Sequence, residues 1–114
     1  MIMPAQTNQL FRGTLHILIL KTLQSGELHG YEIASRIQKR AGGVFAIEDG
    51  ALYQALHRME ERGWLESEWG RAETGKRARF YELTADGKRQ LGFETKNWIQ
   101  YVDAVFNVLQ LKPV

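Results

Sequence analysis

The sequence contains no cysteine, and that absence excludes several kinds of site. Without thiols the chain cannot form disulfides, attack a substrate with a thiolate, or hold zinc through sulfur ligands. The absence is compatible with a reducing compartment, and we expect a cytoplasmic protein.

The chain also has no large excess of positive or negative side chains. The 114 residues carry 15 basic and 13 acidic side chains, which gives a formal net charge of +2. A polybasic nucleic-acid coat is therefore excluded, and any basic surface must come from the arrangement of the charges. The length suits one domain, and an apolar fraction of 44% excludes disorder along the whole chain.

Long hydrophobic runs are absent too. The densest apolar stretch covers residues 15–20, is interrupted by His16, and is flanked by Arg12 and Lys21. A membrane-spanning helix needs about 20 apolar residues, so we expect no membrane partner. Residues 1–9 carry no cationic side chain, which is unlike a secretory signal.

Motifs for catalysis and metal binding are missing. The chain has no glycine-rich phosphate loop, no serine in a nucleophile elbow, and no carboxylate pair with an evident pocket. His16, His29 and His57 do not form a pair four residues apart with a third ligand nearby, as a helical metal site requires. We therefore expect no enzyme, no cofactor and no metal site.

The period of the hydrophobic pattern changes along the chain. Helical spacing predicts three helices, over residues 13–24, 30–41 and 49–62. Alternation then predicts two strands, over residues 64–69 and 78–83, joined by a polar loop. With the long helix that follows, this order predicts a mainly α fold with a small β-hairpin, a winged helix-turn-helix plus a C-terminal dimerisation helix.

Two finer features are expected within the first half of the chain. In the second helix, Tyr31 should face inward together with Ile33, Ala34 and Ile37. The β-prone residues 44–47 should form a small edge strand.

The last helix is expected to begin at Thr84 as its N-cap and to carry a dimer seam. Its apolar residues recur at steps of seven, four, three and four, close to a heptad pattern: Leu91, Trp98, Val102, Val105 and Leu109. Leu10 and Phe11 extend the apolar surface of the first helix, so a symmetric homodimer is expected. The chain thus divides into a flexible N-terminal segment (residues 1–9), a DNA-binding domain (10–84) and a dimerisation helix (85–114).

The outer face of the third helix suits the major groove of DNA. The residues placed to reach the duplex are Ala51, Tyr53, Gln54, His57 and Arg58. Gln54 can pair with adenine through two hydrogen bonds, and Arg58 can bind guanine or a phosphate. The alternative is an ordinary solvated helix face.

The loop between the two strands is cationic. Arg71, Lys76, Arg77 and Arg79 outweigh Glu73 and give +3 within nine residues, which suits the phosphate backbone or the minor groove. Segment 48–63, by contrast, has a net charge of −2, with Glu48 and Asp49 at its start. Asp49 is expected as a helix cap. These acids leave open a winged helix that binds a protein instead of DNA.

Residues 13–87 resemble the PadR family of bacterial transcriptional regulators. The motifs that carry the resemblance are His29-Gly-Tyr-Glu-Ile, Gly50-Ala-Leu-Tyr-Gln-Ala-Leu-His-Arg-Met-Glu, Gly63-Trp-Leu, Arg79-Phe-Tyr-Glu-Leu-Thr and Ala85-Asp-Gly-Lys-Arg. The resemblance implies a homodimeric repressor that binds double-stranded DNA at an inverted repeat. It also implies the small subgroup with a single C-terminal helix.

The resemblance also assigns roles to single residues. Tyr53 matches the family tyrosine that contacts DNA, and Lys76 and Arg77 match the basic tip of the wing. Trp98 falls near the aromatic residue on which some relatives stack a small planar effector, although packing of the dimer is the alternative. Gln54 replaces the usual proline, so the target preference is not inherited.

Overall fold

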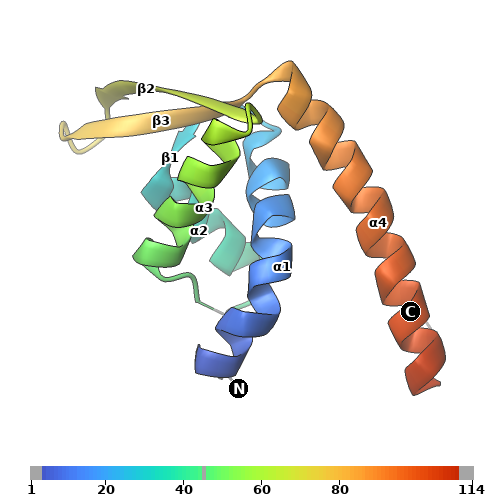
Figure 1. Cartoon of the computed structure of the whole chain (residues 1–114). Coiled ribbons are helices and arrows are strands. Elements are labelled where there is room, and N and C mark those ends of the chain that lie inside the picture. Colours follow the sequence, from blue (N-terminus) through green and yellow to red (C-terminus); the bar gives the residue numbers. More distant parts are fainter. Residues whose placement is uncertain (1–3, 45, 111–114) are drawn as a thin grey trace.

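The computed structural model describes residues 4–44 and 46–110, with side chains from Thr14 onward. Within that part the chain forms four helices and a small sheet (Figure 1). The helices are α1 (Pro4–Leu23), α2 (Gly30–Arg40), α3 (Asp49–Glu61) and α4 (Ala85–Leu109), and the strands are β1 (Leu28–His29), β2 (Leu65–Arg71) and β3 (Arg77–Leu83).

The first three helices enclose the hydrophobic core. The largest fully buried side chains come from all three of them: Ile19, Leu20, Leu23, Ile33, Leu52, Leu56 and Met59. Leu52, Leu56 and Met59 form the inward stripe of α3, as their helical spacing predicts. Because that stripe is fixed in the core, the opposite face of α3 is held toward solvent.

The sheet is antiparallel and has the order β1-β3-β2. β2 and β3 form the predicted hairpin, in a register that pairs Leu65 with Leu83 and Arg71 with Arg77. The strands run further than expected, so the turn covers only residues 72–76. The third strand is β1, whose Leu28 pairs with Tyr81. Residues 44, 46 and 47 are not in a strand, so the expectation of an edge strand at 44–47 is wrong for these positions.

Two other expectations need correction. Helix α1 begins at Pro4 and not near Gly13, so residues 4–9 belong to a helix where we expected a separate flexible segment. Proline suits a first helical position, and nothing between it and Gly13 breaks the helix. Tyr31 does not face inward, because it is 76% exposed at the start of α2, beside the wing.

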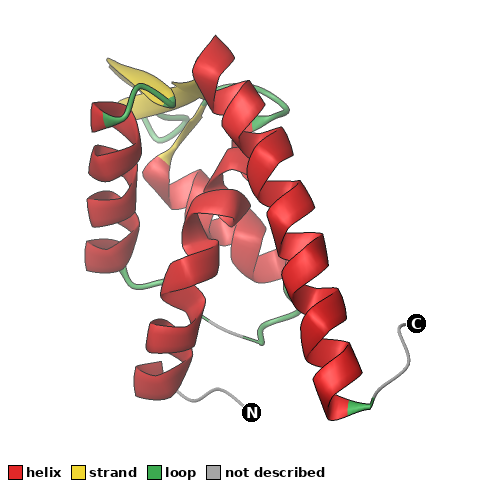
Figure 2. Cartoon of the chain, turned by 45° about the vertical axis from the view of Figure 1, so that its right-hand side comes forward, coloured by secondary structure: helices red, strands yellow, loops and turns green. Residues whose placement is uncertain are grey.

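Hydrogen bonds of Thr84 fix the start of helix α4 against the rest of the domain. The Thr84 hydroxyl accepts from the Gly87 amide at 3.0 Å and donates to the Gly63 carbonyl at 2.6 Å, which confirms Thr84 as the N-cap. The helix then diverges from α1 along its length (Figures 1 and 2). The expected dimerisation helix covers residues 85–114, whereas α4 ends at Leu109 with Gln110 as its C-cap residue, and residues 111–114 lie outside the described residues. Among the described helices, none combines the length and apolarity of a membrane span.

Candidate nucleic-acid interface

The outer face of α3 presents most of the side chains predicted to read DNA. Tyr53 is 43% exposed, and Gln54, His57 and Arg58 are exposed as well. Ala51 differs from them, because it is half-buried and packs against the core. The helix therefore offers one phenol, one amide, one imidazole and one guanidinium within two turns.

Tyr53 is set in place by the start of α2. Gly30 is buried there, and a Cβ on it would lie 2.8 Å from the Tyr53 hydroxyl oxygen and 3.0 Å from a ring carbon. A glycine at this position therefore lets the tyrosine ring lie against the backbone of α2. The first turn of α2 is itself ordered by His29, whose Nδ1 accepts from the Glu32 amide at 3.4 Å.

The first turn of α3 is acidic. Glu48 is the N-cap residue but makes no capping hydrogen bond with its side chain, and Asp49 is the first residue inside the helix. The expectation that Asp49 caps the helix is therefore wrong. An acid at this position still stabilises the helix through the macrodipole. The acids also oppose the close approach of phosphates to this end of α3.

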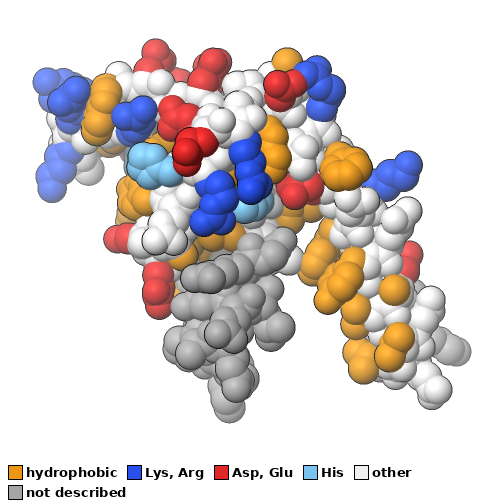
Figure 3. All heavy atoms as spheres, in the orientation of Figure 1, with side chains coloured by type: hydrophobic (Ala, Val, Ile, Leu, Met, Phe, Trp, Pro, Cys, Tyr) orange, Lys and Arg blue, Asp and Glu red, His pale blue; other side chains and the backbone are white. Residues whose placement is uncertain are grey.

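The wing, residues 65–83, carries its cations near the turn. Lys76 and Arg77 are exposed, and the Arg71 guanidinium donates to the Gly75 carbonyl at 3.0 Å. Figure 3 shows the Lys and Arg side chains gathered at the outer end of the wing. The structure thus brings the predicted cationic tip together on one projecting element.

Arg79 lies further back and is already bonded within the chain. Its Nε donates to Ser67 Oγ at 2.8 Å, and its Nη2 lies 3.5 Å from Glu60 Oε2. The Ser67 hydroxyl donates to the same carboxylate oxygen at 2.7 Å. Arg79 therefore joins the wing to the last turn of α3, and part of its charge is compensated.

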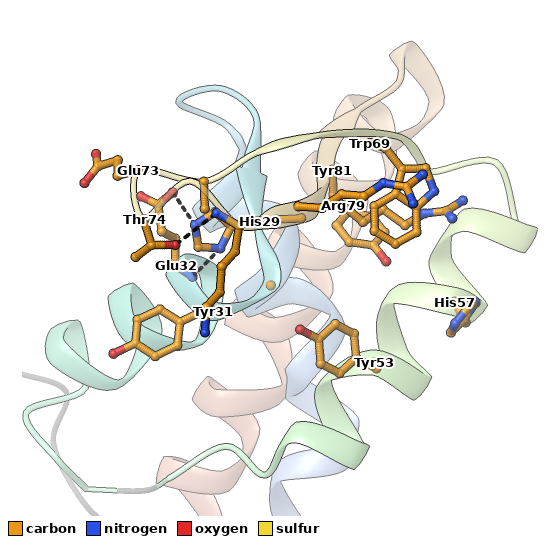
Figure 4. Close-up of a pocket in the computed structure, with 15 residues that line it drawn as sticks. His29, Tyr31, Glu32, Tyr53, His57, Trp69, Glu73, Thr74, Arg79 and Tyr81 are labelled. Carbon is orange, nitrogen blue, oxygen red and sulfur yellow. Dashed lines mark hydrogen bonds and ion pairs between the residues drawn. The ribbon is translucent and has the colours of Figure 1, made fainter.

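A groove of about 700 Å³ separates α3 from the wing (Figure 4). Tyr53 and His57 come from α3, Trp69 and Arg79 from the wing, and Tyr31 from the start of α2. The sequence analysis assigned neither Tyr31 nor Trp69 to a binding site, and it expected Tyr31 in the core. The alternation along β2 and β3 could have placed Trp69 beside Arg79, because it predicts which side chains of the two strands lie on the same face of the sheet.

A second cationic cluster lies where α3 meets α1. Burial lowers the pKa of His16, and the nearby Arg58 and Arg62 guanidinium groups lower it further. The His16 ring packs edge-on against Trp64, and Arg62 lies over the same indole at 5.2 Å. His16 is thus favoured as a neutral packing residue. In the described part of the chain, no three His, Asp or Glu side chains converge as metal ligands.

Helix α4 exposes an apolar stripe beyond its contact with the core. Leu91, predicted to lie in a dimer interface, is 7% exposed and packs in the core of its own chain. Val102 is half-buried, whereas the residues that share its side of α4 are exposed: Trp98, Tyr101, Val105, Val108 and Leu109. The side chains of Leu10 and Phe11 lie outside the described residues.

A groove of about 480 Å³ between α1 and α4 is lined by part of this stripe. The Trp98 and Tyr101 rings stack there with centroids 5.6 Å apart, near Ile17 and Phe93. Burial raises the pKa of Glu94, which lies in the same groove. The arrangement provides aromatic faces for a flat ligand or for a partner helix.

Comparison with known proteins identifies one family model and two relatives. The model described as the transcriptional regulator PadR-like family matches residues 19–92. An uncharacterised protein of Lysinibacillus sphaericus is 28% identical over 98 residues, which covers 86% of this chain and 90% of that protein. The negative transcriptional regulator PadR of Bacillus subtilis is 29% identical over 77 residues. That alignment covers 68% of this chain and 42% of the regulator.

Solved structures show the same architecture. A transcriptional regulator from Clostridium thermocellum is 30% identical, with a TM-score of 0.77, and the match covers 87% of this chain and 95% of that one. A PadR family transcriptional regulator from Eggerthella lenta is 29% identical, with a TM-score of 0.78, and the match covers 95% and 92% of the two chains. Both similarities extend beyond the winged helix into α4.

Proposed function

The chain belongs to the PadR-like family of transcriptional regulators, and from this premise we propose that it is a homodimeric repressor that binds duplex DNA in a sequence-specific manner. One observation carries the proposal. The exposed face of α3 and the cationic wing border a single groove. An α-helix fits the major groove, and a projecting cationic hairpin fits the adjacent backbone or minor groove.

The side chains divide into two kinds of contact. Gln54 and Arg58 are exposed on α3 and reach base edges, where a good bidentate pair discriminates by about 1–3 kcal/mol. Tyr53 and His57 offer hydrogen bonds to phosphate, and Lys76 and Arg77 add charge from the wing. Sequence preference therefore resides in α3, and salt-dependent affinity resides mainly in the wing.

The exposed stripe of α4 supports a dimer. Trp98, Tyr101, Val105 and Val108 recur at steps of three and four on one side of the helix, and a second copy of α4 would cover them. Two copies related by a twofold axis place their α3 helices about 34 Å apart, one turn of DNA, over an inverted repeat.

Footprinting on the DNA upstream of the protein's own gene tests the proposal. We expect protection of two half-sites about one helical turn apart, and tighter binding to this duplex than to a scrambled duplex of equal length. Addition of the protein to a transcription reaction from the same promoter should lower transcript yield. Equal affinity for both duplexes would reject sequence-specific recognition, and a rise in transcript would reject repression.

The acidic start of α3 favours a second candidate function. Glu48 and Asp49 precede the side chains that would read bases, and both are exposed. A winged helix that binds a basic protein partner instead of DNA would use this charge. Failure to retain any duplex at low salt, together with capture of a defined partner, would support this function over the first.

The groove between α1 and α4 supports an effector site for a small planar aromatic compound. Trp98 is half-exposed there and stacks with Tyr101. Quenching of tryptophan fluorescence by planar aromatic dyes, lost in Trp98→Ala while the dimer persists, is the expected result. Unchanged quenching in that variant would assign Trp98 to packing alone.

A further inference from the structure

A continuous series of contacts runs from the last turn of α3 to the tip of the wing. It begins at Glu60, passes through Ser67 to Arg79, and continues to Trp69 and Arg77. Trp69 is paired directly with Arg79 across the hairpin, so the two side chains share a face of the sheet. We call these five residues the wing brace.

Trp69 lies in the brace between two guanidinium groups. The guanidinium carbon of Arg79 is 5.6 Å from the centroid of the indole, and that of Arg77 is 4.3 Å away. The indole is nonetheless 54% exposed, so it does not serve as core packing. Figure 4 shows Trp69 and Arg79 side by side on the wing, across the groove from Tyr53 of α3.

The two arginines differ in how they are bonded. Arg79 is bound to Ser67 and Glu60, which fix its guanidinium group. The fixed guanidinium in turn holds the ring of Trp69 in place. The Arg77 guanidinium contacts the ring of Trp69, and in the described part of the chain it forms no ion pair. A guanidinium stacked on an aromatic face keeps its edge N–H groups available for phosphate.

We propose that Trp69 is a positioning residue for DNA binding, which holds the Arg77 guanidinium on the groove side of the wing while Arg79 fixes the ring to α3. The inference rests on the proposed function, because it concerns how a wing cation meets DNA. Holding Arg77 in place before binding lowers the ordering cost of the complex. Trp69 therefore strengthens binding without itself contacting a base.

A double-mutant cycle separates this role from a direct contact. Trp69→Leu should weaken binding to the duplex about two- to fivefold per subunit, the range expected for one exposed cation–π contact. In an Arg77→Ala background the same substitution should have no further effect, because the cation that it positions is gone. In a Lys76→Ala background, the matched control, Trp69→Leu should keep its full effect. Trp69→Phe should restore most of the affinity, since it restores an aromatic face.

A measurement without DNA tests the geometry itself. The side-chain protons of Arg77 should be shifted upfield by the ring current of Trp69, and the shift should disappear in Trp69→Leu. Circular dichroism and urea unfolding should stay close to those of the unsubstituted protein, because the ring is outside the core.

The outcomes of the two inferences are distinguishable. If the unsubstituted protein binds no duplex, the proposed function and the role of Trp69 are both rejected. If the unsubstituted protein binds the duplex, two results would overturn only the role assigned to Trp69. One is a Trp69→Leu variant that binds as tightly as the unsubstituted protein. The other is a loss of affinity from Trp69→Leu that is as large in the Arg77→Ala background as in the unsubstituted protein. Absence of an upfield shift at Arg77 overturns that role as well.

Discussion

Tyr53 of α3 lies so close to Gly30 of α2 that any side chain at position 30 would displace it. A Cβ there would be 2.8 Å from the Tyr53 hydroxyl oxygen, closer than nonbonded carbon atoms normally approach another atom. The start of one helix therefore sets the position of a candidate DNA contact on the next. The relationship links a glycine with no chemistry of its own to the proposed recognition surface.

Gly30→Ala should weaken DNA binding while leaving the fold intact. The new methyl group moves the Tyr53 hydroxyl away from the phosphate that we propose it contacts, which removes about 0.5–1.5 kcal/mol of binding free energy per subunit. The clash is with a side chain that can rotate away, so the unfolding midpoint in urea should change little. Binding is measured by fluorescence anisotropy of a labelled duplex. In a Tyr53→Ala background, Gly30→Ala should cost nothing more, and an equal cost in both backgrounds would contradict the relationship.

Gly87→Ala should destabilise the whole domain. A Cβ on Gly87 would run into the backbone carbonyl oxygen of Trp64, the same atom that accepts from the Thr84 amide at 3.1 Å. The Trp64 carbonyl belongs to the backbone and cannot rotate away as a side chain can. We therefore expect a loss of about 1–3 kcal/mol in the free energy of unfolding, measured in urea at fixed protein concentration. Gly92→Ala is the matched control, because a Cβ there meets nothing within 4 Å. It should raise stability by about 0.5–1 kcal/mol.

The helical core could be predicted from the sequence because it depends on local spacing. Leu52, Leu56 and Met59 recur at helical intervals, and their burial in α3 follows from that pattern alone. Thr84 as an N-cap followed in the same way from its position before the last periodic segment. Local patterns thus placed α3 and the start of α4 correctly.

The rest of the site depends on contacts between distant residues. The two residues of β1 have no strand pattern of their own, and they become a strand only because β3 offers them an unpaired edge. Arg79 counts as a free cation in the sequence, yet it is bonded to Glu60, 19 residues earlier. Tyr31 fits an apolar stripe by spacing and still faces solvent. Such outcomes are decided by tertiary packing, which a single sequence does not encode locally.

Lys76→Ala and Gln54→Ala should affect DNA binding in different ways. Each phosphate contact contributes about 0.9 to the slope of log K against log salt concentration, so removing Lys76 from both subunits should reduce the slope by about 2. Gln54→Ala should leave the slope unchanged and relax preference at one base pair per half-site. Titrations between 50 and 200 mM salt, on duplexes that differ at single positions, separate the two effects. An unchanged slope in Lys76→Ala would remove Lys76 from the interface.

The stability of the protein should fall as the pH drops below about 6.5. Burial, aided by Arg58 and Arg62, lowers the pKa of His16 in the folded state. The unfolded chain then binds a proton more readily than the folded one. Stability from this group is therefore complete above its ordinary pKa and is lost as the pH falls through the lowered value.

His16→Gln isolates that effect. The variant should show a flatter dependence of unfolding free energy on pH between 5 and 7.5 than the unsubstituted protein. Because burial is the leading cause, Arg58→Gln should reduce the pH dependence only in part. A variant without His16 that keeps the full pH dependence would assign it to other groups.

Val105→Glu should convert the proposed dimer to monomers and thereby weaken DNA binding. Val105 lies on the exposed stripe of α4, one turn from Tyr101, and a buried carboxylate without a partner is strongly unfavourable in an apolar interface. A monomer engages a single half-site and loses the gain from binding both halves together. Asn107→Glu introduces the same charge on the opposite side of α4 and should leave the dimer intact. Sedimentation velocity measures the oligomeric state, and a dimeric Val105→Glu protein would place the interface on another surface.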